Sequence, residues 1–295
     1  MTDRRLTVFA VSAAVLVAAV AVAGCGGDQD TTSERAAKSP PVKPSTRQVT
    51  ARVAGRTLSG HCRGAQHDSP AIVLDSGIAG GQHQLSSIEE QFAQRTVVCA
   101  YDRAGVGGSD PPAKMPRPVS DLVADLDAFA TAASVRAPYL LVGQSAGANI
   151  VFMYAQTYPD KVAGFVSMNP VPPAETFIQA VRQVQTKSEF QEELAFNRGE
   201  NDEGISFNEP TLSDLLPSSM PYAVMFDEDC DGDAEFCRRI LPPLTQTTKS
   251  LAIVGERGRF VRARDAGHNI FETNPELVQG TINDVLSAVN SKATG

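Results

Sequence analysis

The chain of 295 residues is 42% hydrophobic and 20% charged, with a formal net charge of -8. This composition is typical of a soluble globular protein and excludes a chain disordered throughout, a collagen and a protein with many membrane spans. Acidic residues (34) outnumber basic residues (26), and the basic residues are scattered, so we expect no nucleic acid as a partner.

The first 24 residues are predicted to be a secretory signal. Arg4 and Arg5 precede an apolar run over residues 6–22, whose length is marginal for a bilayer span. Small residues then lead directly to Cys25, a pattern that resembles the lipobox of bacterial lipoproteins. The resemblance implies cleavage after Gly24, a lipid on the Cys25 thiol, and an exported protein held at the cell membrane by that anchor. An ordinary signal peptide, or an N-terminal anchor in which Cys25 is incidental, is the alternative.

Residues 25–48 are predicted to form a flexible tether. They consist mainly of Gly, Asp, Thr, Ser, Lys and Pro, with almost no apolar residue to bury in a core. The remainder, residues 49–295, has the length of one α/β domain with a full core. We find no internal repeat and expect a monomer.

Four further cysteines predict two disulfides, because an exported chain enters an oxidising compartment. Cys62 and Cys99 flank strand-like runs that are candidate neighbours in one sheet, while Cys230 and Cys237 lie close together in one loop. Of the three possible pairings we favour these two. We expect no metal and no other cofactor, since the cysteines are spread over three segments and the chain has only four histidines. An acidic run between the last two predicted strands partly resembles a calcium loop, but Arg238 stands where a glutamate ligand is expected.

Short apolar, β-branched runs separated by helical stretches predict an α/β fold. The predicted strands are residues 71–74, 96–101, 139–142, 163–168, 222–226 and 260–264. Strands that are apolar on both faces and alternate with helices indicate a mostly parallel sheet flanked by helices on both sides. Ligands of such sheets bind beyond the carboxyl ends of the strands. The residues directly after each run are therefore the candidates for function.

Residues 172–219 interrupt this alternation and are predicted to form a small helical cap. Residues 174–196 suggest one or two helices, and residues 197–217 a polar, acidic loop. Five apolar residues of the cap are candidates for a wall of the substrate site or for the core of the cap itself: Phe177, Ile178, Phe190, Leu194 and Phe196.

The nucleophile elbow is the strongest motif in the chain. Gly143, Ser145 and Gly147 form Gly-x-Ser-x-Gly directly after a predicted strand and before a predicted helix. In such a sharp turn the serine is lifted above the sheet, and the amide of Ala146 points outward from a helix N-terminus, where it stabilises an oxyanion. The sequence therefore predicts Ser145 as a nucleophile with the amide of Ala146 beside it.

Two other strand ends are predicted to support this serine. The run ending in Gly77 is followed by Ile78, whose amide is the candidate second donor of the oxyanion hole. The glycine-rich loop after the next predicted strand carries Asp102 and Arg103, which we interpret as structural support. Because Pro111 and Pro112 follow that loop in place of a long helix, it does not fit a dinucleotide site.

His268 is the candidate general base. It follows the last predicted strand behind Ala266 and Gly267, and it lies after Ser145 in the chain. This fits the order serine, acid, histidine of one class of catalytic triads. The other histidines precede Ser145 and do not fit that order.

Beyond the elbow, residues 101–109, 158–164 and 266–269 resemble the α/β-hydrolase family. The similarity runs from about residue 49 to residue 285, apart from the cap. It implies an α/β-hydrolase fold with an eight-stranded sheet, and a triad in which Ser145 and His268 take the roles of nucleophile and base.

The acid of the triad is not assigned by the resemblance alone. Family members carry it after the penultimate strand or, less often, one strand earlier, where this chain has the uncharged Asn169. The acidic loop after the penultimate strand remains. Asp229 is the first choice, because it lies far enough past the strand for the loop to fold back toward His268. Asp227 and Asp231 are the alternatives.

These residues predict a serine hydrolase that works through an acyl-enzyme. A serine at the elbow argues against the dehalogenase and epoxide hydrolase branches of the family, which use an aspartate. We favour hydrolysis of carboxylic esters, with a small-molecule ester or a lipid as substrate. The alternatives are a peptidase or amidase on the same scaffold, and a non-catalytic envelope lipoprotein that uses the fold as a binding module.

Overall fold

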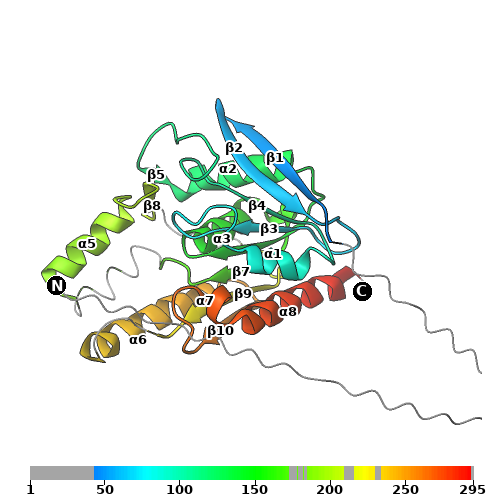
Figure 1. The fold of residues 1–295 in the computed structure, drawn as a ribbon. Coiled ribbons are helices and arrows are strands. Elements are labelled where there is room, and N and C mark those ends of the chain that lie inside the picture. Colours follow the sequence, from blue (N-terminus) through cyan, green and yellow to red (C-terminus); the bar gives the residue numbers. More distant parts are fainter. Residues whose placement is uncertain are drawn as a thin grey trace, which may run out of the picture. The chain divides into compact units, whose positions relative to one another are not determined.

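The computed structural model describes residues 43–172, 178, 182, 185–208, 216–229 and 234–293, in which strands alternate with helices (Figure 1). The strands are β1 (Thr46–Val53), β2 (Arg56–Arg63), β3 (Ile72–Asp75), β4 (Val98–Tyr101), β5 (Arg117–Pro118), β6 (Tyr139–Gln144), β7 (Val162–Met168), β8 (Ile205–Ser206), β9 (Tyr222–Asp227) and β10 (Gly258–Ala263). The helices are α1 (Ser86–Phe92), α2 (Val119–Ala132), α3 (Ala146–Thr157), α5 (Lys187–Asn197), α6 (Ala234–Leu251), α7 (Ile270–Thr273) and α8 (Pro275–Ala293), with a 3-10 turn at Pro159–Lys161.

Eight strands form the main sheet in the order β1-β2-β4-β3-β6-β7-β9-β10. The pairs β1–β2 and β2–β4 are antiparallel, and the remaining neighbours are parallel. Every residue of β3, β4, β6 and β9 is buried, because helices cover both faces. One core joins the sheet to α2 and α3, and the other joins it to α1, α7 and α8. The predicted fold class is confirmed.

The N-terminal strands differ from the sequence prediction. β1 begins at Thr46, so the folded domain starts before residue 49 and takes in the end of the predicted tether. Most residues of β1 are exposed at the edge of the sheet, which is why this strand lacks the continuous apolar run of the central strands. Residues 1–42, with the predicted signal and Cys25, lie outside the described residues. No helix in the described part of the chain is long and apolar enough to cross a bilayer.

The predicted Cys62–Cys99 disulfide joins β2 to β4, where the two residues are direct partners in the antiparallel register. Both cysteines are buried. Cys237, in α6, is also disulfide-bonded. Its predicted partner, Cys230, lies outside the described residues.

The cap region is only partly a loop. α5 begins after Thr186, whose side chain accepts a hydrogen bond from the amide of Glu189 in a capping box. Beyond α5, the stretch predicted as a polar loop contains β8, which pairs in parallel with β5. Glu203, Ile205 and Phe207 of this stretch are buried. These contacts join the cap to the rest of the domain, and sequence periodicity does not reveal them.

A buried polar cluster joins β2 to α1. Its members are His61, Gln82, Glu89 and Asp102. His61 lies 2.6 Å from a carboxylate oxygen of Glu89 through Nε2, and 2.7 Å from Oε1 of Gln82 through Nδ1. The Gln82 amide nitrogen donates to Asp102 at 2.8 Å, so its oxygen faces the histidine. Both ring nitrogens of His61 therefore face oxygen acceptors, an environment that favours the protonated ring. The hydrogen bond to Glu89 raises the pKa of His61 above its ordinary value, against the opposing effect of burial.

We expect this cluster to make stability depend on pH. The pKa of His61 is higher in the folded state than the ordinary 6.5, so its contribution is fully present below pH 6.5 and is lost as the pH rises through the folded-state pKa. Urea unfolding of wild type over a pH series checks this. The His61→Gln protein should lack that fall in the free energy of unfolding, whereas a variant of the exposed His67, His67→Gln, should keep it. Identical pH profiles for His61→Gln and wild type would contradict the assignment.

Candidate active site

Ser145 occupies the sharp turn between β6 and α3. Its backbone angles are φ 54° and ψ -117°, in a region that is strained for any residue other than glycine. The turn is held from both sides: the Ser145 amide donates to the Met168 carbonyl on β7 at 2.8 Å, and the Ser145 carbonyl accepts from Ala148 at 3.0 Å. A costly conformation maintained in this way is typical of a functional residue.

The two glycines of the motif allow close contact between backbones. A Cβ on Gly147 would lie 2.2 Å from the carbonyl oxygen of Asp75, and one on Gly143 would lie 2.3 Å from the carbonyl oxygen of Gly147. The Gly147 amide also donates to the Ser76 carbonyl at 3.1 Å. The start of α3 is therefore pressed against the loop after β3, and no side chain fits between them.

That loop presents the predicted oxyanion donor. The Gly77 amide donates to Gln84 at 2.7 Å, the Ala79 amide donates to Glu203 at 2.6 Å, and the Gly80 amide donates to the Gly77 carbonyl at 3.1 Å. Among the described residues the amide of Ile78 has no such partner. Ile78 and Ser145 line the same cavity, and the amide of Ala146 begins α3 directly after the serine. The arrangement suits two donors aimed at one developing negative charge.

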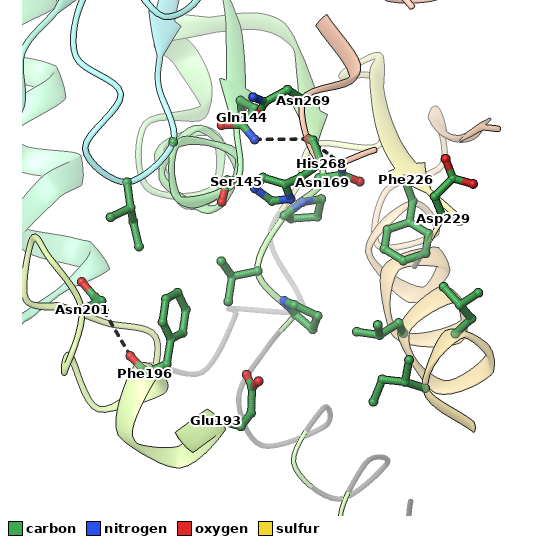
Figure 2. A pocket seen from close by; sticks show the side chains of 18 of the residues that line it. Gln144, Ser145, Asn169, Glu193, Phe196, Asn201, Phe226, Asp229, His268 and Asn269 are labelled. Carbon is green, nitrogen blue, oxygen red and sulfur yellow. Dashed lines mark hydrogen bonds between the residues drawn. The ribbon is translucent and has the colours of Figure 1, made fainter. Parts of the chain in front are cut away.

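The His268 loop is fixed to the strand ends through its backbone. The side-chain nitrogen of Asn169 donates to the His268 carbonyl at 2.9 Å, and Gln144 approaches the same oxygen at 3.4 Å (Figure 2). The Asn169 oxygen accepts from the Asp227 amide at 2.8 Å. Asn169, which we discounted as the acid because it is uncharged, therefore joins β7, β9 and the histidine loop. Its φ of 46° is one that asparagine tolerates better than most residues.

The candidate acids have different environments. Asp227 ends β9 and accepts from the Asp229 amide at 3.1 Å. Burial raises the pKa of the Asp227 carboxyl, and backbone amides of the histidine loop partly offset this. Asp229 accepts from the Gly267 amide at 3.3 Å and lines the same cavity as His268. Asp231 lies outside the described residues. Of the two described candidates only Asp229 lines the cavity, and the acid remains a prediction.

Ser145 and His268 line a cavity of about 920 Å³. In Figure 2 the cap residues Phe196 and Glu193 lie below them. The apolar wall of the cavity comes from the β7 loop, the cap, β9 and α6: Val171, Phe196, Phe226, Ile240, Leu241 and Leu244. Of the predicted apolar cap residues that the structure describes, only Phe196 lines it; α6 supplies much of the wall instead. This volume lies within the range of small-molecule sites.

Among the described residues of the cavity wall, every charged side chain other than His268 is a carboxylate. Glu193, Asp202 and Asp229 line the cavity, and no described lining residue is a lysine or arginine. Burial raises the pKa of Glu193, with its hydrogen bond to Asn197 acting in the opposite direction. In the part of the chain that the structure describes, no three metal-ligating side chains cluster. The acidic run considered as a calcium loop is only partly described, so that alternative is not tested.

The sequence comparisons agree with this architecture. A family model described as the alpha/beta hydrolase fold matches residues 70–259, so the chain belongs to that family. YqjL of Bacillus subtilis (strain 168) is 23% identical over 210 residues, which cover 71% of this chain and 79% of YqjL. RutD of Escherichia coli O1:K1 / APEC is 31% identical over 103 residues, and this match spans only 38% of RutD and 35% of this chain.

Solved structures show the same fold at low sequence identity. An esterase from Thermogutta terrifontis is 18% identical with a TM-score of 0.59, covering 83% of this chain and 99% of the esterase. A bacterial membrane phospholipase A is 18% identical with a TM-score of 0.58, covering 83% of this chain and 87% of the phospholipase. These structures show the fold alone, whereas the family match places the chain among the α/β-hydrolases; its substrate is a separate question.

The contact at Gly147 gives a stability prediction. The Gly147→Ala protein should lose about 1–3 kcal/mol of unfolding free energy, as overpacked positions do, because the new methyl group would collide with the Asp75 carbonyl. The matched control is Gly280→Ala in α8, where a Cβ meets nothing within 4 Å. That variant should gain up to about 1 kcal/mol from helix propensity. Urea unfolding measures both, and equal stabilities for the two variants would contradict the tight packing of the elbow.

Proposed function

We propose that the protein is a serine hydrolase of carboxylic esters. The observation that carries this proposal is the geometry of Ser145, which is held in a strained turn at the mouth of a cavity that His268 also lines. The amides of Ile78 and Ala146 are the proposed oxyanion donors. Asp229 is the proposed acid that orients His268 and stabilises its charge.

The proposed reaction has two halves. His268 takes the proton of Ser145 as the serine oxygen attacks the ester carbonyl, and the two amides stabilise the oxyanion of the tetrahedral intermediate. The alcohol leaves with the proton from His268, so an acyl-enzyme remains on Ser145. Water, deprotonated by His268, then attacks the acyl group and releases the carboxylic acid.

The apolar part of the cavity wall suits an ester substrate with an apolar acyl group. Leu241 and Leu244 of α6 and Phe196 of the cap offer apolar surface within the catalytic cavity. The esterase and the phospholipase A that share the fold act on esters by their names, which agrees with this choice. A peptidase or amidase on the same scaffold is the alternative, and acyl esters and acyl amides of matched chain length distinguish the two.

The first functional prediction concerns a series of p-nitrophenyl esters from short to long acyl chains. Wild type should hydrolyse them, and Ser145→Ala should fall to the small residual rate that an oxyanion hole and binding alone supply. Steady-state kinetics measures the rates, and circular dichroism checks that both proteins are folded. A rate that peaks at short chains indicates an esterase, and one that peaks at long chains a lipase. Equal rates for the two proteins would rule out Ser145 as the nucleophile.

The second prediction concerns substrate charge. Carboxylates on the cavity wall repel an anionic acyl group, so kcat/KM for p-nitrophenyl hemisuccinate should be at least about tenfold below that for the butyrate, roughly 1.4 kcal/mol. The Glu193→Gln change should lower the ratio of kcat/KM for the butyrate to kcat/KM for the hemisuccinate. Glu200→Gln, at an exposed cap residue that does not line the cavity, should leave it unchanged. An unaltered ratio in Glu193→Gln would show that this carboxylate does not select against anions.

A further inference from the structure

Arg103 is a buried cation that contacts the loop after β3, the loop that carries Ile78. Its side chain is 1% exposed, and it follows β4. A guanidinium at such a site is tolerated only when its charge and its hydrogen-bond donors are compensated. All five N–H groups have acceptors: Nε and Nη2 donate to the two oxygens of Glu203, Nη1 donates to Asp75 and to the Ser76 carbonyl, and Nη2 also donates to the Gly77 carbonyl.

Glu203 reaches this cation from the cap. It is 5% exposed and lies 100 residues from Arg103 in sequence. Its backbone is anchored nearby, since the carbonyl of Gly204 accepts from the Arg117 amide of β5 at 2.8 Å. Besides pairing with Arg103, Glu203 accepts the Ala79 amide at 2.6 Å. One carboxylate therefore binds both the buried cation and the loop after β3.

Two carboxylates, Asp75 and Glu203, stabilise the charge of Arg103. Burial opposes the charge on Arg103, but Asp75 and Glu203 outweigh it, so the pKa of Arg103 lies above its ordinary value. Burial raises the pKa of Asp75, while Arg103 and a hydrogen bond from Tyr101 at 2.9 Å act against that rise. Removing the Glu203 charge would leave the cation short of one partner, which is costly in a buried site.

The consequence for the loop is geometric. Arg103 holds the carbonyls of Ser76 and Gly77, and Glu203 holds the amide of Ala79. These groups flank the Ile78 amide on both sides. The peptide plane that carries the Ile78 N–H contains the Gly77 carbonyl, so fixing that oxygen fixes the direction of the N–H.

We propose that Glu203, supplied by the cap, is a positioning residue that aims the Ile78 amide into the oxyanion hole through Arg103 and Ala79. This inference rests on the proposed function of Ser145. It makes the segment that carries Glu203 a part of the catalytic frame, so this segment stays in place when substrate binds. A preorganised donor contributes more to transition-state stabilisation than one that must first reorient.

The test is the Glu203→Gln protein. Its amide nitrogen would face the Arg103 donors, so the loop should loosen. We expect kcat for a p-nitrophenyl ester to fall about 10- to 100-fold, less than the loss from deleting an oxyanion donor outright, with KM nearly unchanged. The pKa seen in the kcat/KM profile should not move, because His268 is untouched. Inhibition by an alkyl boronic acid, whose serine adduct mimics the tetrahedral intermediate, should weaken by the same factor as kcat/KM.

Two further variants keep the test decisive. Glu203→Asp keeps the charge that the fold needs but is too short to reach Arg103 and Ala79 together, so a smaller fall in kcat is expected even if Glu203→Gln does not fold. The control is Asp127→Asn, which removes a carboxylate bound to Tyr154 and Lys161 at the far end of α3. It should lower stability and leave kcat unchanged.

The outcomes separate this inference from the proposed function. If wild type shows Ser145-dependent hydrolysis but both folded Glu203 variants keep the wild-type kcat and boronic acid affinity, the positioning role is wrong and the esterase proposal stands. If Glu203→Gln and Asp127→Asn lose stability and kcat alike, Glu203 is merely structural. Absence of Ser145-dependent turnover in wild type would overturn the proposed function itself.

Discussion

Two backbone segments meet at the carboxyl end of the sheet with no room for a side chain between them. Gly147, at the start of α3, touches the carbonyl of Asp75 and donates to that of Ser76. This contact sets the distance between the serine turn and the loop of Ile78, so both proposed oxyanion donors depend on it. The strained backbone of Ser145 persists because β7 and α3 hold it on either side. The candidate chemistry therefore depends first on backbone packing.

The second support of the site is electrostatic and comes from outside the sheet. Arg103 brings a charge into the interior, and the carboxylates that compensate it come from β3 and from the cap. Because Glu203 is one of them, the cap is joined to the loop that carries Ile78. The cavity wall has carboxylates and no described lysine or arginine, so the same cap also shapes the field that a substrate meets. One inserted segment would then both position the Ile78 amide and select against anionic substrates.

The features that the sequence predicts correctly are the local ones. The elbow lies within five residues of a strand and a helix, and the central strands are apolar on both faces, so both were predictable. The edge strand β1 was missed because its exposed residues break the apolar pattern. The roles of Glu203 and Asn169 were missed because their partners lie 124 and 99 residues away, and a polar residue shows no periodicity that reveals a distant partner. The acid of the triad remains a prediction, since the loop that follows Asp229 is not described.

The most direct test of the central claim is covalent labelling of the folded wild-type protein with a fluorophosphonate, followed by intact-mass and peptide mass spectrometry. An activated serine reacts with this probe, whereas an ordinary serine hydroxyl does not. The account predicts one adduct per chain, located on Ser145, and none on the Ser145→Ala protein. A folded wild-type protein with no adduct, or with its adduct on another serine, would contradict the assignment of Ser145 as the nucleophile.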